Sequence, residues 1–211
     1  DEQGFPDDVL ELQGYLSEGG TRQGVRAIPG MGTQVPIWLL GSSLYGAQLA
    51  AHLGLPYAFA SHFAPEMLLQ ALQVYRSTYR PSPAWPKSHA MVGVNVVAAD
   101  TDEEAARLFT SIQQRFLGMQ RGQRGPLPHP ISPAQLETMW TPQERVGVHG
   151  MLAASAVGSA ASVRQQLQAL VDQTGADELI VAGAVHDHAA RLRSYELLAE
   201  LGPALRAALS A

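Results

Sequence analysis

Short apolar runs alternate with longer stretches of helical pattern along most of this chain. Four of the runs are bounded by turn-forming or polar residues, which is typical of strands buried in a parallel sheet. They are residues 35–40, 56–61, 88–99 and 177–185. The first of them, VPIWLL, is continuously apolar, and we therefore expect it to be buried on both faces.

Apolar residues at helical spacing, with serine, proline or acidic residues near the start of each stretch, predict helices between these strands. The helical stretches are residues 5–18, 43–53, 64–80, 100–116, 158–175 and 186–209. The last contains Gly202 and Pro203, where we expect it to kink or break. The alternation predicts an α/β fold of parallel strands with right-handed crossovers, in either a doubly wound sheet or a (β/α)8 barrel. Four strand and helix units are too few to close an eight-stranded barrel.

Two segments lack this regularity. Residues 21–34 are rich in turn-forming dipeptides, although residues 25–28 could form a short strand. Residues 117–150 begin with many glycines and prolines and contain only short helical patterns, so we interpret them as an insertion or mobile loop. Because 46% of the 211 residues are hydrophobic and only 16% are charged, we expect residues 1–211 to form a single globular domain.

Composition excludes several classes of function. The formal charge is −5 and no cluster of Lys and Arg is present, so nucleic acid is not an expected partner. The absence of cysteine excludes disulfides and Cys-ligated metal sites. No apolar run approaches the ~20 residues of a membrane span and no signal pattern is present, so we expect a cytoplasmic protein. The chain starts at Asp1 rather than Met, which indicates a processed, trimmed or partial chain.

Gly41, Ser42 and Ser43 separate a predicted strand from a predicted helix. Free amides, the helix dipole and two hydroxyls would favour a phosphate group here, but N-capping of the helix by one serine explains the same pattern. Gly46 lies one turn into the helix, where its missing side chain would let a ligand approach. A serine nucleophile is disfavoured, because Gly-Ser-Ser-Leu-Tyr-Gly departs from the Gly-x-Ser-x-Gly of a nucleophile elbow.

Other polar residues allow both a functional and a structural interpretation. His186, Asp187 and His188 could suggest a metal site, but without a further ligand cluster we expect no metal and interpret Asp187 as a cap of the final helix. Asn95 is a polar residue within an apolar strand and needs a hydrogen-bond partner. Trp140 could form a lid over an apolar substrate, or it could simply pack against its neighbours.

Two blocks of the sequence resemble the luciferase-like flavin-dependent monooxygenases, in the subgroup related to bacterial luciferase. They are PIWLLGSSLYGAQLAAHLGLPYAFASHFAPEMLLQALQVYRSTYRPS and HDHAARLRSYELLAE. The resemblance includes Ala-Ala-x-x-Gly-Leu-Pro, here Ala50 to Pro56, and is weak between about residues 117 and 150. It implies a (β/α)8 TIM barrel of the bacterial luciferase type, of which this chain contains about the second half, strands five to eight.

The resemblance also implies a cofactor site and an activity. Reduced FMN would bind at the carboxyl ends of the strands, and the expected contacts are Gly41, Ser42, Ser43, Leu44, Gly46, Ser61 and His62. The implied protein is an FMN-dependent monooxygenase, a homodimer that uses reduced flavin and O2 to oxygenate a small, apolar organic substrate. NAD(P)H would be the indirect source of electrons, through a flavin reductase. No catalytic residue can be assigned, and this half alone is expected to be inactive. The alternative is a non-catalytic, flavin-binding or structural half-barrel that self-associates through its open sheet.

Overall fold

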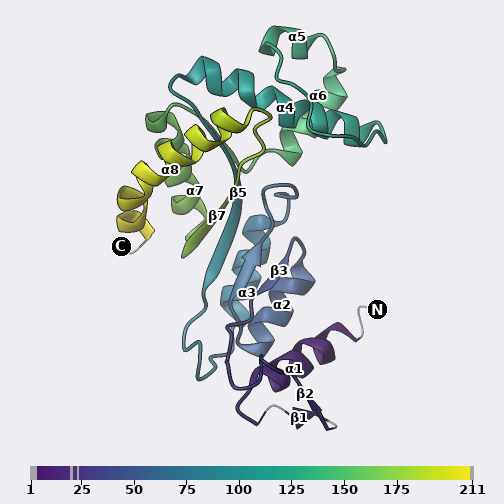
Figure 1. The fold of residues 1–211 in the computed structure, drawn as a ribbon, viewed down its shortest axis with the longest axis vertical. Helices are drawn as coiled ribbons and strands as arrows, with labels where there is room; N and C mark the ends of the chain where they lie inside the picture. Colours follow the sequence, from purple (N-terminus) through teal and green to yellow (C-terminus); the bar gives the residue numbers. More distant parts are fainter. Residues whose placement is uncertain (1–3, 20, 23, 210–211) are drawn as a thin grey trace.

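A parallel sheet organises the computed structural model, which describes residues 4–19, 21–22 and 24–209. Its four main strands lie in the order β3, β4, β5, β7, and all neighbours are parallel (Figure 1). Their bounds are β3 Leu39–Gly41, β4 Tyr57–Phe59, β5 Ala90–Ala98 and β7 Glu178–Ala182. The four predicted strands are thus confirmed, although each is shorter than its apolar run.

A fifth strand, β6 (Ser155–Gly158), was not predicted. Asn95 of β5 pairs with Ser155 on one side and with Ala182 of β7 on the other, so β6 follows β4 along the same edge of β5. The outer edge of β6 is closed by the side chain of Gln166, which bonds both backbone groups of Val157. The four-residue strand is too short and too rich in small residues to be distinguished from a turn by its sequence pattern.

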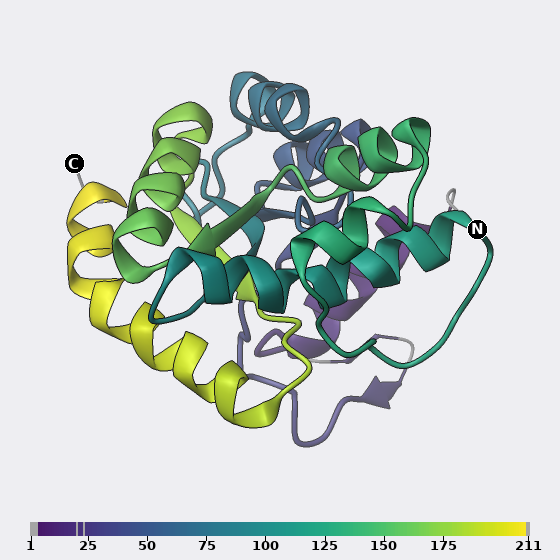
Figure 2. The same cartoon turned by 90° about the horizontal axis from the view of Figure 1, so that it is seen from above.

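Helices follow the strands as the sequence predicts, and Figure 2 shows α4 lying across the carboxyl end of the sheet. The helices are α1 Phe5–Leu16, α2 Leu44–Leu53, α3 Leu68–Thr78, α4 Asp102–Gln120, α5 Pro133–Glu137, α6 Pro142–Met151, α7 Ala160–Thr174 and α8 His188–Leu209, and β1 Thr21–Arg22 pairs with β2 Val25–Arg26. Of the expected kink or break at Gly202 and Pro203, the break is wrong, because α8 continues through both residues, and the kink stays a prediction. The φ of proline is compatible with a helix, and its missing N–H removes only one bond of the ladder.

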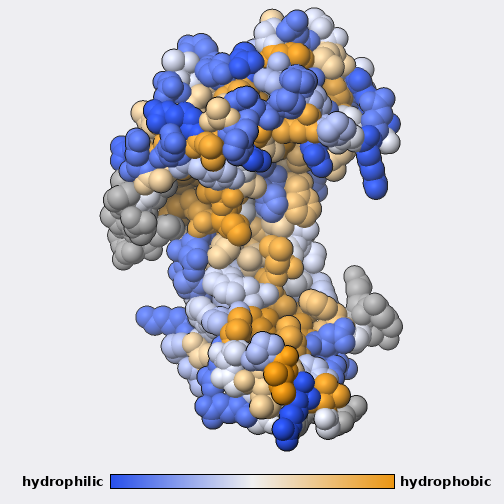
Figure 3. Space-filling model, in the orientation of Figure 1, coloured by the Kyte–Doolittle hydropathy of each residue, from blue (hydrophilic) through white to orange (hydrophobic). Residues whose placement is uncertain are grey.

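The sheet is covered unequally on its two faces. Leu39, Tyr57, Phe59 and Val92 pack with α2 and α3, and Val94 and Val96 pack with α7 and α8. On the alternate positions Leu40 is 68% exposed and Ile180 is 52% exposed. The expectation that residues 35–40 are buried on both faces is therefore wrong, since helices cover only one face of β3. Figure 3 shows hydrophobic residues exposed around the narrow middle of the molecule.

Residues 117–150 are more ordered than the irregular insertion expected from their composition. The helix α4 extends to Gln120, and both α5 and α6 begin with complete capping boxes, Ser132 with Gln135 and Thr141 with Glu144. Val148 and Leu152 pack against Phe116 in a shared apolar cluster. The interpretation as a loop is therefore wrong for most of the segment, because a reciprocal cap stabilises even a short helix.

Trp140 lies at the edge of that cluster, and its packing accounts for it. Its ring meets the ring of His149 edge to face, with centroids 5.5 Å apart, and its Nε1 donates to Glu137. The role of a lid over substrate stays a prediction.

The pairing of α6 with α4 should depend on pH through Glu144. Hydrogen bonds from Arg121, and then from Thr141, lower the pKa of Glu144 from 4.5 to about 2. Because the folded pKa lies below the unfolded one, the ionised carboxylate stabilises α6 above pH 4.5, and this contribution is lost as the pH falls toward 2. In circular dichroism titrations we expect Glu144→Gln to flatten the acid limb of stability. Superimposable acid limbs for wild type and Glu144→Gln would contradict this assignment.

Candidate functional site

An apolar cavity of about 350 Å3 lies where β4, β5 and β7 end. One wall comes from the strand ends, namely His62, Phe63, Asn95, Ala182 and Ala184. The opposite wall comes from α4 and the segments after it, namely Ile112, Arg115, Phe116, Met119, Leu127 and Met151. Small-molecule sites of α/β proteins are expected at the carboxyl ends of parallel strands, and they combine an apolar lining with a few polar groups. This cavity has both properties.

His62 is the polar group most closely fixed by the strand ends. Its backbone carbonyl accepts a hydrogen bond from the side-chain amide of Asn95, which is 4% exposed. This bond confirms that the buried amide in the apolar strand has a partner. The imidazole lies over Gly93, where a side chain would not fit: an ideal Cβ there would be 2.5 Å from Nδ1 of His62. Gly93 and Asn95 together therefore set both the backbone and the ring of His62.

One nitrogen of the His62 imidazole has no hydrogen-bond partner. Nδ1 is buried and makes no hydrogen bond with any residue that the structure describes. Burial lowers the pKa of His62 below its usual 6.5, so the ring is neutral at pH 7. The phenyl ring of Phe63 meets it edge to face, with centroids 5.0 Å apart. The residue lines the apolar cavity, while its unpartnered Nδ1 lies against Gly93, so the imidazole is a candidate polar contact for a ligand that enters the cavity.

Ser61, predicted as a cofactor contact, has a structural role in this fold. Its hydroxyl donates to the carbonyl of Gly93 at 2.5 Å, and the residue has no exposed surface. The bond joins the end of β4 to the middle of β5 and so fixes the strand end that carries His62. A contact between Ser61 and a cofactor stays a prediction.

Gly41, Ser42 and Ser43 lie at the end of β3 and the start of α2, as predicted. Ser43 occupies the N-cap position, yet its side chain makes no capping hydrogen bond. The simple capping explanation is therefore wrong. The hydroxyl of Tyr57 donates to the carbonyl of Ser43 at 3.2 Å and holds the turn. The turn leaves two serine hydroxyls beside the amino end of a helix, where an anion is favoured.

Leu44 and Gly46, the remaining predicted contacts, face the fold interior. Leu44 packs against the cluster around Tyr57. An ideal Cβ on Gly46 would lie 3.5 Å from Cε2 of Tyr57 and 3.8 Å from Cα of Gly41. Packing therefore accounts for Leu44, whereas a methyl group would fit at Gly46 and packing does not require a glycine there. The ligand contacts of both residues stay predictions. The carbonyl of Gly41 accepts from the amide of Ala60 at 2.9 Å, which places this turn beside the strand end that leads to His62, although it does not line the cavity.

The three polar residues after β7 do not converge. Asp187 accepts a hydrogen bond from the amide of Ala190 at 2.8 Å, which confirms its capping role. The ring of His186 stacks on His129 with centroids 3.8 Å apart, whereas His188 contacts Arg191. In the part of the chain that the structure describes, no three His, Cys, Asp or Glu side chains are grouped to hold a metal.

The sequence analysis missed Gly93, Arg115 and Phe116. A lone glycine within a strand pattern indicates a close backbone approach, so Gly93 carried a readable signal. Arg115 and Phe116 carried no such signal, because only the fold shows that this part of α4 lies against the strand ends.

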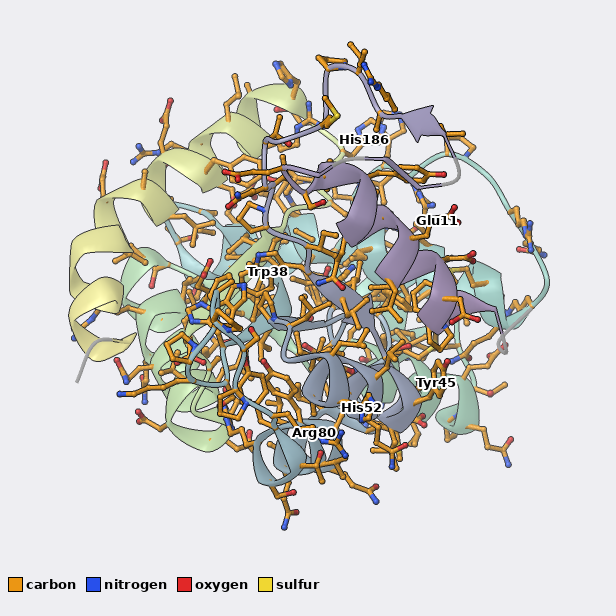
Figure 4. The ribbon with its side chains drawn as sticks, turned by 90° about the horizontal axis from the view of Figure 1, so that it is seen from below. Glu11, Trp38, Tyr45, His52, Arg80 and His186 are labelled. Carbon is orange, nitrogen blue, oxygen red and sulfur yellow. The ribbon has the colours of Figure 1, made fainter. Side chains whose placement is uncertain are left out.

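Figure 4 views the protein from below, with Trp38 near the middle at the amino ends of the strands. Trp38 packs there against Trp85 and His89. It therefore lies at the end of the sheet opposite the cavity.

The parallel sheet with an apolar cavity at its carboxyl end defines the class as an α/β protein with a candidate small-molecule site. Comparison with known proteins is more specific. Residues 8–178 match the sequence profile of the family described as Luciferase-like monooxygenase. A Luciferase-like monooxygenase of Escherichia coli (strain K12) is 51% identical over 193 residues, which are 92% of this chain and 57% of that protein.

Solved structures agree with this assignment. The crystal structure of apo-MsnO8 superposes with a TM-score of 0.81 at 33% identity, covering 95% of this chain and 60% of the other. The oxygenating constituent of 3,6-diketocamphane monooxygenase from Pseudomonas putida, in complex with FMN, has a TM-score of 0.51 at 20% identity over 86% of this chain and 51% of its own. The latter likeness shows the fold alone. The chain belongs to the luciferase-like monooxygenase family, and it spans little more than half the length of the relatives it matches.

Among the residues described, no helix has both the length and the apolar character needed to cross a membrane.

Proposed function

We propose that this chain is the carboxyl-terminal half of a (β/α)8 barrel in an FMN-dependent monooxygenase. The observation that carries the proposal is the apolar cavity at the carboxyl ends of the strands, in a chain of the luciferase-like family. Its strands β3, β4, β5 and β7 would be strands five to eight of the barrel. The exposed Leu40 and Ile180 support this, because the first four strands would cover that open face. Residues 1–211 would then be one structural unit, with α5 and α6 inserted before β6.

The residues at the start of α2 fit a flavin phosphate. Ser42 and Ser43 offer two hydroxyls that the helix does not use for capping, beside amides and a helix dipole that favour an anion. These residues would hold the phosphate, and His62 would face the ring system or the substrate from the neighbouring strand end. When bound, reduced FMN supplies the electrons that activate O2.

The residues of this chain would contribute positioning and exclusion of water. Phe63, Phe116 and Met119 give the cavity an almost wholly apolar lining, which favours a small apolar organic substrate. The neutral imidazole of His62, held by Asn95 and Gly93, would donate or accept one hydrogen bond there. We further propose a cytoplasmic homodimer that receives electrons from NAD(P)H through a flavin reductase.

The phosphate assignment is tested by Ser42→Ala combined with Ser43→Ala, in the longer protein that would contain the whole barrel. Loss of the two hydroxyls should weaken FMN binding, followed by flavin fluorescence quenching, by about 1 to 3 kcal/mol. Stability should change little, because Ser43 makes no capping bond. Ser159→Ala is the matched control: Ser159 does cap α7 through its side chain, so this variant should lose stability and keep its FMN affinity. Unchanged FMN affinity in the double variant would reject the assignment.

The exposed sheet face also favours a second candidate, a non-catalytic half-barrel that self-associates. Leu40 and Ile180 would then be covered by a second copy rather than by earlier strands of the same chain. The two candidates differ for residues 1–211 studied alone. A stable dimer that binds no FMN at high micromolar concentration supports the second, whereas FMN binding by the longer protein supports the first.

A further inference from the structure

Arg115 and Arg124 are free cations beside a second cavity. In the part of the chain from α4 to α6, Arg107, Arg121 and Arg145 each pair with a glutamate. By contrast, the guanidinium groups of Arg115 and Arg124 form no ion pair or hydrogen bond with any residue that the structure describes. Both line a groove of about 510 Å3 between α4 and residues 123–128. A chain with a formal charge of −5 thus leaves two guanidinium groups unneutralised in one groove.

The groove adjoins the apolar cavity. Arg115 and Met119, one turn apart on α4, line both spaces. On one side of these two residues, Ile112 and Phe116 line the cavity. On the other side, Gln114 and Gly118 line the groove. A ligand that passes Met119 would therefore leave an almost wholly apolar surface and reach two cations.

The far wall of the groove is held in place by hydrogen bonds to α4. The amide of Gln123 donates to the carbonyl of Gly118 at 2.8 Å, and the side chain of Gln114 donates to the carbonyl of His129 at 3.0 Å. The hydroxyl of Thr110 accepts from the amide of Ile131 at 2.9 Å. The segment that carries Arg124 is thus tied at both ends, so the groove is a formed feature of the surface.

We propose that this groove binds the carboxylate of the substrate, so that the substrate is an organic acid with an apolar chain. The apolar chain would occupy the cavity beside His62, and the carboxylate would lie between Arg115 and Arg124. Guanidinium groups recognise carboxylates through paired N–H donors. The two spaces, about 350 and 510 Å3, each fall within the range of small-molecule sites. The inference rests on the proposed function, because it assigns the apolar end of the substrate to the proposed reaction site.

The test compares decanoate with decan-1-ol, which has the same chain length and no charge, by isothermal titration calorimetry. Wild type should bind decanoate about ten-fold more tightly, with a preference that falls as salt is raised. Arg115→Gln and Arg124→Gln should each reduce the preference to about three-fold or less, and Arg115→Lys should retain part of it. Arg164→Gln, on the exposed side of α7 and likewise unpaired among the described residues, is the matched control and should keep the full preference.

The outcomes separate this inference from the proposed function. FMN affinity is measured on the same variants, with circular dichroism to show that each is folded. If FMN binds but decanoate and decan-1-ol bind equally, the carboxylate site is wrong and the proposed function stands. If Arg115→Gln weakens FMN and leaves the decanoate preference intact, the groove serves the cofactor and the inference is overturned. If both Arg→Gln variants reduce the preference for decanoate but the protein never binds FMN, the carboxylate site is supported and the proposed flavin-dependent function is wrong.

Discussion

Gly54→Ala is expected to lower the free energy of unfolding by about 3 kcal/mol. Gly54 ends α2 in the left-handed conformation, with φ of 62°, where a side chain costs about 1 kcal/mol. The larger part is steric, because an ideal Cβ would lie 2.6 Å from the carbonyl oxygen of Arg80 and 2.9 Å from Cβ of Ser82. That carbonyl is backbone and cannot rotate away. The same junction also carries hydrogen bonds from Tyr79 and Ser82 to the carbonyl of Gly54.

Gly175→Ala is the matched control for this prediction. Gly175 ends α7 with φ of 57°, but its ideal Cβ would lie 3.6 Å or more from its neighbours, the guanidinium atoms of Arg76. Gly175→Ala should therefore lower the free energy of unfolding only by the cost of the left-handed conformation, about 1 kcal/mol. In urea denaturation the difference between the two variants, about 2 kcal/mol, measures the steric part alone. Equal losses would show that the contact with Arg80 relaxes at no cost.

Gly54 also illustrates what the sequence could predict. Helix ends, strands and their order follow from local patterns, such as the glycine that stops α2 and the β-branched run of β5. The need of the Asn95 side chain for a hydrogen-bond partner was also predictable, because a buried amide must be hydrogen-bonded. Each of these inferences uses residues that are close in the sequence.

The rest depended on contacts between distant residues. That Leu40 is exposed while Leu39 is buried follows from which face of β3 the helices cover, and an apolar run cannot show this. The unpaired state of the Arg115 side chain could not be predicted either. Arg107 on the same helix and Arg121 at its C-cap find glutamates at different distances along the chain. The capping boxes of α5 and α6 were readable as Ser132 to Gln135 and Thr141 to Glu144, but the surrounding prolines and glycines hid them.

Gly93→Ala is expected to displace His62 from the cavity wall and to destabilise the protein by about 2 kcal/mol. The new methyl group would lie 2.5 Å from Nδ1 of His62 and 3.2 Å from the carbonyl oxygen of Phe59. The imidazole can rotate away and the carbonyl cannot, so the ring should move while the strand stays strained. Gly150→Ala, whose ideal Cβ meets nothing within 4 Å, is the control and should lose no stability.

The displaced ring gives this prediction a second readout, the pKa of His62 measured by NMR titration. In wild type, burial holds that pKa below 6.5. The unfolded state then binds more protons than the folded one, and stability is lost as the pH falls below 6.5 through the folded pKa. In Gly93→Ala the ring should reach water, the pKa should return toward 6.5, and this pH dependence should disappear.

A double variant distinguishes displacement of the ring from general strain. Removing the ring with His62→Ala should make Gly93→Ala less costly than it is alone, with a coupling of about 1 kcal/mol. Additive losses, or an unchanged pKa of His62 in Gly93→Ala, would contradict the close approach of ring and strand. A positive result would establish that the missing side chain at position 93 is what lets a neutral imidazole approach the strand closely at the cavity wall.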